Sequence, residues 1–224
     1  MGYYAWLYER KKKKVQRCIA YFLAGKYNRA KRICQDMKNP IEGDILAVKA
    51  LMAEPERGEL AQNRELYCQL WDAKIRSVKN VELSRVVDAK LAEITPAVLA
   101  YAKEDIQKMH KHYLAGEKEA LYRLCKEHVA YGHPDAVALN IWGCMKLGPM
   151  EHSKEYYMMH LGSALYKDFK YELETAISKG LSEEFQEHSQ TLIQELDRLI
   201  ELLGDGIVTD PVPPPRNEDW FGWY

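Results

Sequence analysis

The sequence predicts an all-α fold of stacked helical hairpins, and three observations support this class. Helix-forming residues such as Ala, Leu, Glu, Lys and Arg are common in the 224-residue chain, and the alternation typical of strands is never sustained. Glycine stands at several predicted turns between apolar segments of helical spacing. The third observation is a repeat at a constant offset of 91 residues, in which Leu23-Ala24-Gly25 and Arg32-Ile33-Cys34 return as Leu114-Ala115-Gly116 and Arg123-Leu124-Cys125.

The repeat predicts that one helical unit is written twice, as an approximate 91-residue duplication. Further residues match at the same offset: Asp44 with Asp135, Ala47 with Ala138, Leu70 with Leu161 and Ala73 with Ala164. We therefore expect Gly25 and Gly116 to form equivalent turns, and Cys34 and Cys125 to occupy equivalent buried positions.

Apolar residues at helical spacing predict the helices of the first half of the chain. These helices cover residues 5–23, 27–38, a segment beginning at Asp44, 56–78 and 81–94. Gly25 is expected to end the first helix and Asn39-Pro40 the second. Asp44 is expected to cap the third helix. Thr95 and Pro96 are expected to begin a new helix, because proline is favoured at the first helical position.

The second half of the chain is expected to follow the same order. Its predicted helices run from Thr95 to near Gly116, over 117–131 and 135–147, through Tyr156–Leu161, and from Ser182 to about Leu203. Glu183 and Glu184 place acidic side chains in the first turn of the last helix, where they favour the helix dipole. We expect about nine to eleven helices in a right-handed stack.

These elements divide the chain into four predicted parts. Residues 1–94 form a first helical repeat unit and residues 95–180 a second one. Residues 181–204 form a C-terminal helix. Residues 205–224 form a tail that is expected to be extended, since four prolines occur within residues 211–215.

Two short segments resemble known helical repeats. Tyr21–Ala30 resembles the turn of a tetratricopeptide repeat (TPR), in which a gly-lys-tyr turn joins two helices and a small residue follows. Tyr131–Ala136, with Trp142-Gly143 and Leu147-Gly148 downstream, is similar to a Sel1-like repeat. The resemblance implies a TPR-like α-solenoid that serves as a protein-binding scaffold and carries out no chemistry.

The composition predicts a cytoplasmic protein without a membrane segment. No apolar run approaches ~18 residues, and the positive charges near the N-terminus follow the aromatic stretch, whereas in a secretory signal they precede it. Five cysteines are dispersed without a CxxC pair, which favours reduced thiols packed as small hydrophobic side chains.

Charge is distributed unevenly along the chain. Residues 1–40 carry eleven Lys/Arg against two acidic residues, and residues 171–224 carry three against twelve. The basic candidates for binding nucleic acid or an acidic partner are Arg10, Lys11, Lys12, Lys13, Lys14 and Arg17. The aromatic residues just upstream, among them Trp6 and Tyr8, are suited to stacking on bases. The alternative is a solvated helix face whose aromatic residues pack on the next helix.

The C-terminal tail contains a second candidate for partner binding. Pro211–Arg216 has the PxxPxR spacing that aromatic-lined grooves bind, and the alternative is a stiff linker. The last residues are aromatic and costly to leave in water: Trp220, Phe221, Trp223 and Tyr224. We expect them to dock on the protein's own helices or on a partner, and the acidic C-terminal region to attract the basic N-terminal region by direct contact.

Arg32 and Arg123 are a third candidate, because they recur at the offset of the repeat. On the inner side of a curved helical stack, two such arginines would hold carboxylates of a partner protein bidentately. The alternative is that each arginine ties neighbouring helix ends together.

No catalytic signature is recognisable in the sequence. A glycine-rich phosphate loop, a GxSxG elbow, the kinase motifs and HExxH do not occur, and no paired spacing of zinc ligands is present. We therefore predict no enzymatic activity, no metal, no cofactor and no small-molecule substrate. The predicted function is that of a non-enzymatic adaptor or scaffold that binds another protein or itself. The alternative is a helical subunit of a nucleoprotein complex that binds DNA or RNA through the basic N-terminal helix.

Overall fold

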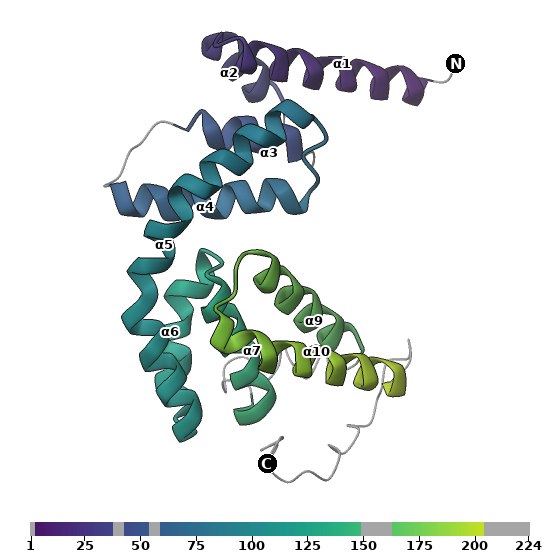
Figure 1. Ribbon diagram of the computed structural model, residues 1–224. Coiled ribbons are helices and arrows are strands. Elements are labelled where there is room, and N and C mark those ends of the chain that lie inside the picture. The colour runs from purple at the N-terminus through teal and green to yellow at the C-terminus, as the bar shows by residue number, and fades with distance from the viewer. Residues whose placement is uncertain (1–2, 38–42, 54–58, 149–162, 204–224) are drawn as a thin grey trace. The chain divides into compact units, whose positions relative to one another are not determined.

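The protein is helical throughout the residues that the computed structural model describes, which are 3–37, 43–53, 59–148 and 163–203 (Figure 1). The predicted all-α class is confirmed there, since these ranges contain no strand. The helices are α1 (Tyr3–Leu23), α2 (Tyr27–Gln35), α3 (Gly43–Leu51), α4 (Glu59–Ile75), α5 (Val81–Ala115), α6 (Lys118–Ala130), α7 (Pro134–Leu147), α9 (Ser163–Ser178) and α10 (Glu183–Leu203). The predicted helix through Tyr156–Leu161 and the tail 205–224 lie outside these ranges.

The helices form two compact units, residues 1–101 and residues 102–224, and α5 contributes to both. In the first unit α1 packs on α2 and α3, α2 packs on α3, and α3 packs on α4. In the second unit α7 contacts α6, α9 and α10, and α9 also packs on α10. Each unit therefore has its own core, built largely from apolar side chains of short antiparallel helices.

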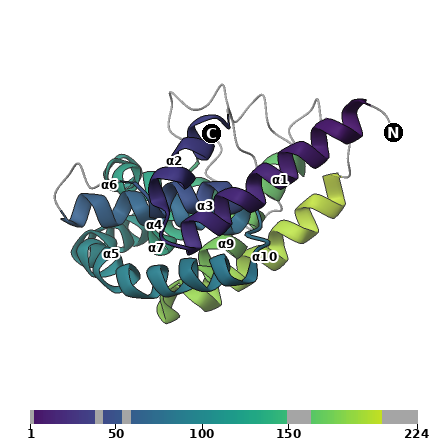
Figure 2. The ribbon, with the colours of Figure 1, turned by 90° about the horizontal axis from the view of Figure 1, so that it is seen from above.

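Among the described side chains of α1, the buried and partly buried ones begin at Lys14, in the C-terminal half of the helix. Val15, Cys18 and Ile19 are buried, because residues three and four apart lie on one side of a helix. The N-terminal half of α1 extends past the other helices of the unit (Figures 1 and 2). Trp6 and Tyr8 on this half are 50% and 66% exposed, although both are large aromatic residues. The overhang is what presents the basic residues of α1 to solvent.

The two predicted glycine turns have the same geometry. Gly25 has φ of 69° and Gly116 has φ of 72°, in the left-handed region that glycine adopts without steric cost. Beyond Gly25, the Lys26 backbone N–H donates to the Tyr21 carbonyl at 2.8 Å. Beyond Gly116, the Glu117 N–H donates to the His112 carbonyl at 2.9 Å. The glycine turns thus satisfy the last carbonyls of α1 and α5 in the same way, which confirms their predicted equivalence.

The predicted helix break at Thr95 and Pro96 is wrong, because α5 is continuous from Val81 to Ala115 with Pro96 inside it. Proline removes one backbone hydrogen bond, but Pro96 lies on the exposed side of the helix. Ile94 and Val98, on either side of it, are buried. Burial of these apolar side chains keeps both halves of the helix in place, so tertiary packing overrides the local break signal.

The carboxylates of Asp44 and Asp135 each accept hydrogen bonds from the residues just before a later helix. The prediction that Asp44 caps its own helix is therefore wrong. The Asp44 Oδ1 atom accepts the Lys79 and Asn80 backbone N–H groups at 2.9 and 3.0 Å, just before α5. The Asp135 carboxylate accepts the Ser182 N–H at 2.8 Å and the Ser182 hydroxyl at 2.6 Å, just before α10. Both aspartates are buried, so these hydrogen bonds replace the water that a carboxylate requires.

Helix starts and burial follow the offset of 91 residues only as far as α3 and α7. The starts of α2 and α6 are 91 residues apart (118 − 27), and so are those of α3 and α7 (134 − 43). The starts of α5 and α10 are 102 residues apart (183 − 81). Ala73 and Ala164 match in sequence but differ in environment, because Ala73 is buried and Ala164 is exposed. Leu161 lies outside the described residues.

The change of offset has a structural cause. The helix α7 has 14 residues where α3 has 9, and the segment that precedes α9 is longer than the one that precedes α4. Leu70 and Ala73 of α4 are buried, and so are Leu173 and Ala176 of α9, which stand 103 residues later (173 − 70). Cys34 and Cys125 lie before this change, and the prediction that both are buried is confirmed.

Candidate partner-binding site

A row of cationic and aromatic side chains runs along the outer side of α1. We call this row the basic ridge, and its members are Trp6, Arg10, Lys13, Arg17 and Tyr21. Their spacing of three or four residues places them on one side of the helix. Buried residues such as Val15 and Ile19 lie on another side. The four members from Trp6 to Arg17 are exposed, and Tyr21 is partly buried at the turn end of α1.

Both ends of the basic ridge pair an arginine with an aromatic ring. The Arg10 guanidinium lies 5.3 Å from the centre of the Trp6 ring. At the other end, Arg29 of α2 lies 5.7 Å from the centre of the Tyr21 ring. Such contacts stabilise a flat guanidinium over a ring and leave its edge free for an anion. Beside the ridge, Lys14 Nζ lies 3.5 Å from a carboxylate oxygen of Asp36.

The ridge is electrostatically unfavourable for the isolated helix. Arg10 precedes Lys13 by three residues, and Lys13 precedes Arg17 by four, so like charges are neighbours on the helix surface. Each such pair destabilises a helix by a few tenths of a kcal/mol. The cations also lie in the middle of α1, away from the C-terminal turn where the helix dipole would favour them. Binding of a polyanion would remove this repulsion.

The counterpart positions 91 residues later carry no such ridge. They are Ala97, Tyr101, Glu104, Lys108 and His112 of α5. Here Lys108 Nζ donates to Asp105 Oδ1 at 2.9 Å, and this hydrogen bond holds the pKa of Asp105 below its usual range. Residues 3–37 contain ten Lys/Arg and two acidic residues, whereas residues 94–128 contain six and five. Of the two compared segments, the one formed by α1 and α2 therefore carries the positive surface, and the segment of α5 and α6 does not repeat it.

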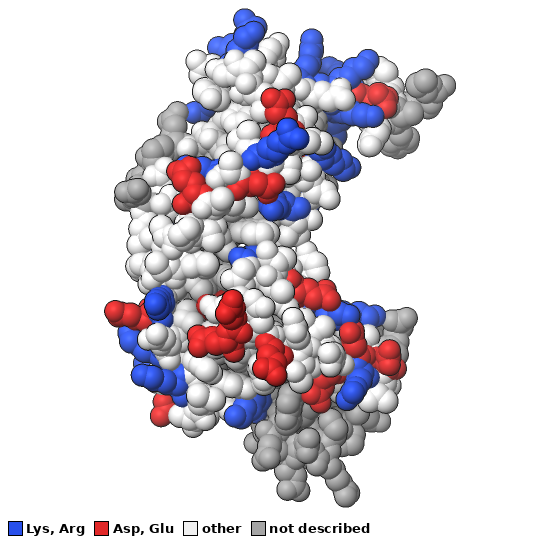
Figure 3. Space-filling view, in the orientation of Figure 1, with Lys and Arg blue, Asp and Glu red and all other residues white. Residues whose placement is uncertain are grey.

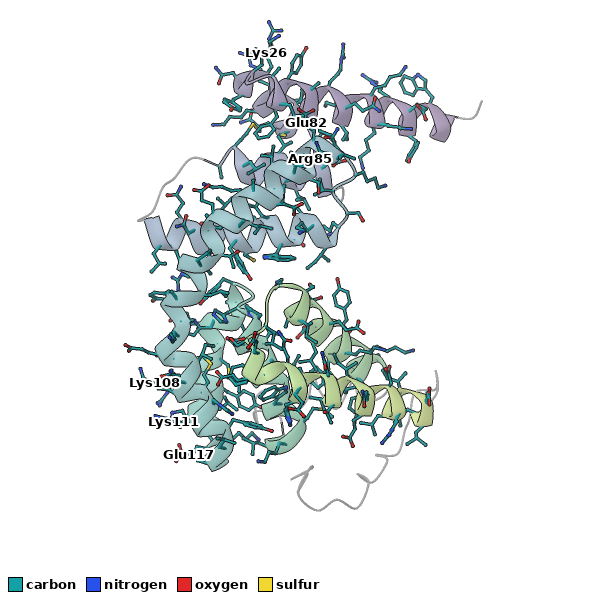
Figure 4. The ribbon with its side chains drawn as sticks, viewed as in Figure 1. Lys26, Glu82, Arg85, Lys108, Lys111 and Glu117 are labelled. Atoms are coloured by element: carbon teal, nitrogen blue, oxygen red, sulfur yellow. The ribbon has the colours of Figure 1, made fainter. Side chains whose placement is uncertain are left out.

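The surface views agree with this contrast. Lys and Arg predominate over α1 and α2, whereas acidic and basic side chains are mixed over the second unit (Figure 3). Lys26 projects from the turn between α1 and α2, so the positive surface continues beyond the ridge (Figure 4). In the second unit Lys108 and Lys111 stand near Glu117, at the C-terminal end of α5 (Figure 4).

The other predicted partner-binding residues are only partly described. Arg32 of α2 and Arg123 of α6 are both exposed, and neither forms a salt bridge with another residue in the described ranges. The predicted grip on partner carboxylates and its alternative, a tie between neighbouring helix ends, both stay predictions for these two arginines. The aromatic residues of the tail, Trp220, Phe221, Trp223 and Tyr224, lie outside the described residues.

The second unit contains an aromatic and histidine cluster that the sequence does not reveal. The His188 ring lies 4.3 Å from the Trp142 ring, and its Nε2 atom is 3.5 Å from the Tyr113 hydroxyl. Lys146 Nζ lies 4.9 Å from the centre of the Tyr113 ring. Burial lowers the pKa of His188, and the charges of Lys146 and His110 lower it further. Three different helices supply these residues, so no spacing in the sequence indicates the cluster.

The His188 cluster predicts a pH dependence of stability. The unfolded chain binds a proton at His188 near pH 6.5, while the folded protein resists protonation until a lower pH. The free energy of unfolding is therefore expected to fall as the pH drops below about 6.5. His188→Gln is expected to flatten this dependence in urea unfolding at pH 7.5 and pH 5.5. An unchanged slope in the variant would contradict the assignment to His188.

Asp105, His128 and Tyr131 form a hydrogen-bonded Asp–His–Tyr chain of the kind that some active sites contain. The His128 Nε2 atom lies 3.2 Å from Asp105 Oδ2, and its Nδ1 atom lies 2.7 Å from the Tyr131 hydroxyl. His128 is 1% exposed and Tyr131 is buried, so a substrate has no access to the hydroxyl. These hydrogen bonds connect α5 to the end of α6, which is a structural role.

Within the residues that the structure describes, no three His, Cys, Asp or Glu side chains lie together in a way that would hold a metal ion. None of the helices in these ranges is both long and apolar enough to cross a membrane. Comparison of the chain with protein-family models, curated proteins and solved structures gives no match.

Proposed function

We propose that this protein is a non-enzymatic binding scaffold and that the basic ridge docks an acidic segment of a partner protein. The scaffold consists of two related helical units in a TPR-like arrangement, of which the first carries the binding surface. Four of the five cysteines are buried and none is in a disulfide, which fits a reducing compartment such as the cytoplasm.

The relation between the units is supported by paired features of helix geometry. Two pairs of helices start 91 residues apart. Each unit also has a left-handed glycine turn and a buried aspartate that accepts hydrogen bonds from the segment before a later helix. Duplication of one helical unit explains these features together, with extra residues between α7 and α9 accounting for the later offset. Repeated helical hairpins commonly present surfaces that bind proteins.

The single observation that carries the binding proposal is the charge contrast between α1 and the corresponding part of α5. The same helical positions are cationic in α1 and mixed in α5, so the fold itself does not require the cations. The ridge also costs stability through like-charge neighbours. Complementary carboxylates on a partner would offset that cost and guide association through the positive field.

Nucleic acid is the second candidate, and one observation favours it. Trp6 is half exposed beside Arg10, and Tyr21 lies beside Arg29, so a ring stands at each end of the cationic row. Single strands bind to positive surfaces on which aromatic side chains stack with bases. Under this candidate, affinity would fall steeply with salt, because phosphate binding releases counterions.

The proposal predicts that reversing the ridge charges weakens binding of an acidic peptide. In the variant R10E/K13E/R17E, we expect the affinity for a labelled peptide of ten Asp and Glu residues to fall at least tenfold at about 0.15 M salt. Fluorescence anisotropy measures the affinity, and circular dichroism checks that helix content is unchanged. The matched control, K103E/K111E/K126E, changes three exposed lysines of the second unit and is expected to alter the affinity less than twofold.

The same titration with a single-stranded oligonucleotide separates the two candidates. If the ridge binds the oligonucleotide but not the peptide, and if this binding weakens steeply with salt, the partner is a nucleic acid and not an acidic protein. Equal binding of the peptide by the wild-type protein and the ridge variant would contradict the proposal itself.

A further inference from the structure

Two cysteines face each other in the interface between α1 and α2. Cys18 of α1 is fully buried and Cys34 of α2 is 3% exposed. Their Sγ atoms are 3.1 Å apart, and Cys18 Sγ also lies 3.6 Å from the Ala30 carbonyl oxygen. Sulfur atoms in a disulfide are about 2.05 Å apart, so a movement of about 1 Å would allow the bond to form.

The second unit supplies a natural comparison for this pair. Met109 and Cys125 stand 91 residues after Cys18 and Cys34, and their sulfur atoms are 3.8 Å apart. Two sulfur-containing side chains thus pack at the corresponding place in both units. A thioether cannot form a disulfide, so packing alone does not require the second thiol that the first unit carries.

The electrostatic surroundings assign different roles to the two thiols. The hydrogen bond between the two sulfur atoms lowers the pKa of Cys34, and the positive charge of Lys49 lowers it further. The same hydrogen bond and burial raise the pKa of Cys18. Cys34 is therefore the thiol that forms a thiolate first, and the thiolate is the reactive form.

We propose that Cys18 and Cys34 are a redox-sensitive pair that forms a reversible disulfide between α1 and α2. The oxidant is a low-molecular-weight disulfide, such as oxidised glutathione. The Cys34 thiolate attacks one sulfur of this disulfide, forms a mixed disulfide and releases one thiolate. Cys18, once deprotonated, attacks the Cys34 sulfur and expels the second thiolate. Two protein thiols become one disulfide, and the oxidant is reduced to two thiols.

Access to the buried pair requires local opening of the first helical hairpin. The described side chains in the N-terminal half of α1 are exposed, and this half extends past the other helices of its unit (Figure 1). Elements at the edge of a unit open at a lower free energy than its core. A disulfide between residues 16 positions apart would prevent this opening by closing a loop through the turn at Gly25. Oxidation would thus hold the helix that carries the basic ridge on α2, and this inference does not depend on the partner.

The experiment compares the full chain after incubation with oxidised or with reduced glutathione, without denaturant. In the oxidised sample we expect a mass about 2 Da lower, a peptide that links Cys18 to Cys34, and a Tm higher by about 5 °C. The matched control, Cys18→Met, copies the Met109 arrangement of the second unit. It should lose both the linked peptide and the Tm rise. Cys34→Ala gives the same test if Cys18→Met reduces helix content.

Several outcomes would overturn the inference. The absence of the Cys18–Cys34 peptide from the oxidised sample would show that the native fold does not bring the two thiols together. A glutathione adduct on Cys68 alone, or a link between Cys125 and Cys144 alone, would assign the reactivity to other cysteines. A Tm rise that persists in both cysteine variants would mean that the disulfide is not its cause.

Discussion

Replacing Asp135 with Ala is expected to lower the free energy of unfolding of the second unit by about 3 kcal/mol. The buried carboxylate accepts both the backbone N–H and the hydroxyl of Ser182, and it connects the start of α7 to the start of α10. Hydrogen bonds to a charged group contribute about 1.5–3 kcal/mol each, and the Ser182 groups would be left without this acceptor. The loss is therefore expected to exceed that of an ordinary surface substitution several-fold.

Urea unfolding followed by circular dichroism measures this effect. Asp44→Ala is the corresponding variant in the first unit, and we expect a loss of about 2–3 kcal/mol because two backbone N–H groups lose their acceptor. Asp36→Ala is the control, since Asp36 is exposed and its ion pair with Lys14 contributes little. A loss of less than 1 kcal/mol in Asp135→Ala would contradict the role of this carboxylate.

Replacing Gly43 with Ala is expected to destabilise the first unit by about 3 kcal/mol or more. An added Cβ atom would lie 2.4 Å from the Ala73 carbonyl oxygen and 2.8 Å from the carbonyl carbon and oxygen of Ser77. These are backbone atoms at the end of α4, so no side-chain rotation relieves the clash. Ser77 already has φ of 63°, an uncommon conformation for serine, which limits further adjustment.

Gly25→Ala separates this steric effect from backbone conformation. No atom lies within 4 Å of a Cβ atom at Gly25, so only the left-handed φ opposes the substitution. We expect a loss of about 1 kcal/mol there, well below that of Gly43→Ala. Thermal unfolding of both variants gives the comparison. Equal losses would mean that the close approach of α3 to the end of α4 does not limit stability.

Local features of the fold were predictable from the sequence. The turns at Gly25 and Gly116 follow from glycine and its neighbours, because a left-handed residue after a helix is a local requirement. The burial of Cys34 and Cys125 follows from apolar spacing along one helix face. The cations of the basic ridge were also identified, since their spacing of three and four residues depends on helix geometry alone.

Features that depend on contacts between helices were not predictable. Pro96 signals a break, but α5 continues through it because buried side chains on both sides pack on their units. Asp44 has the local features of a helix cap, yet its carboxylate binds backbone groups 35 and 36 residues away. The sequence also did not predict that the 91-residue offset ends after α7. Ala73 and Ala164 match in sequence, but Ala73 is buried and Ala164 is exposed.

The sequence by itself determined that the chain is helical, where its glycine turns lie, and which helix concentrates positive charge. These properties depend on residues within a few turns of one another. Only the tertiary structure decided which half of α1 extends past its unit, and which aspartate holds which later helix. It also decided that Cys18 faces Cys34, because these relations arise where side chains distant in the sequence compete for the same buried space.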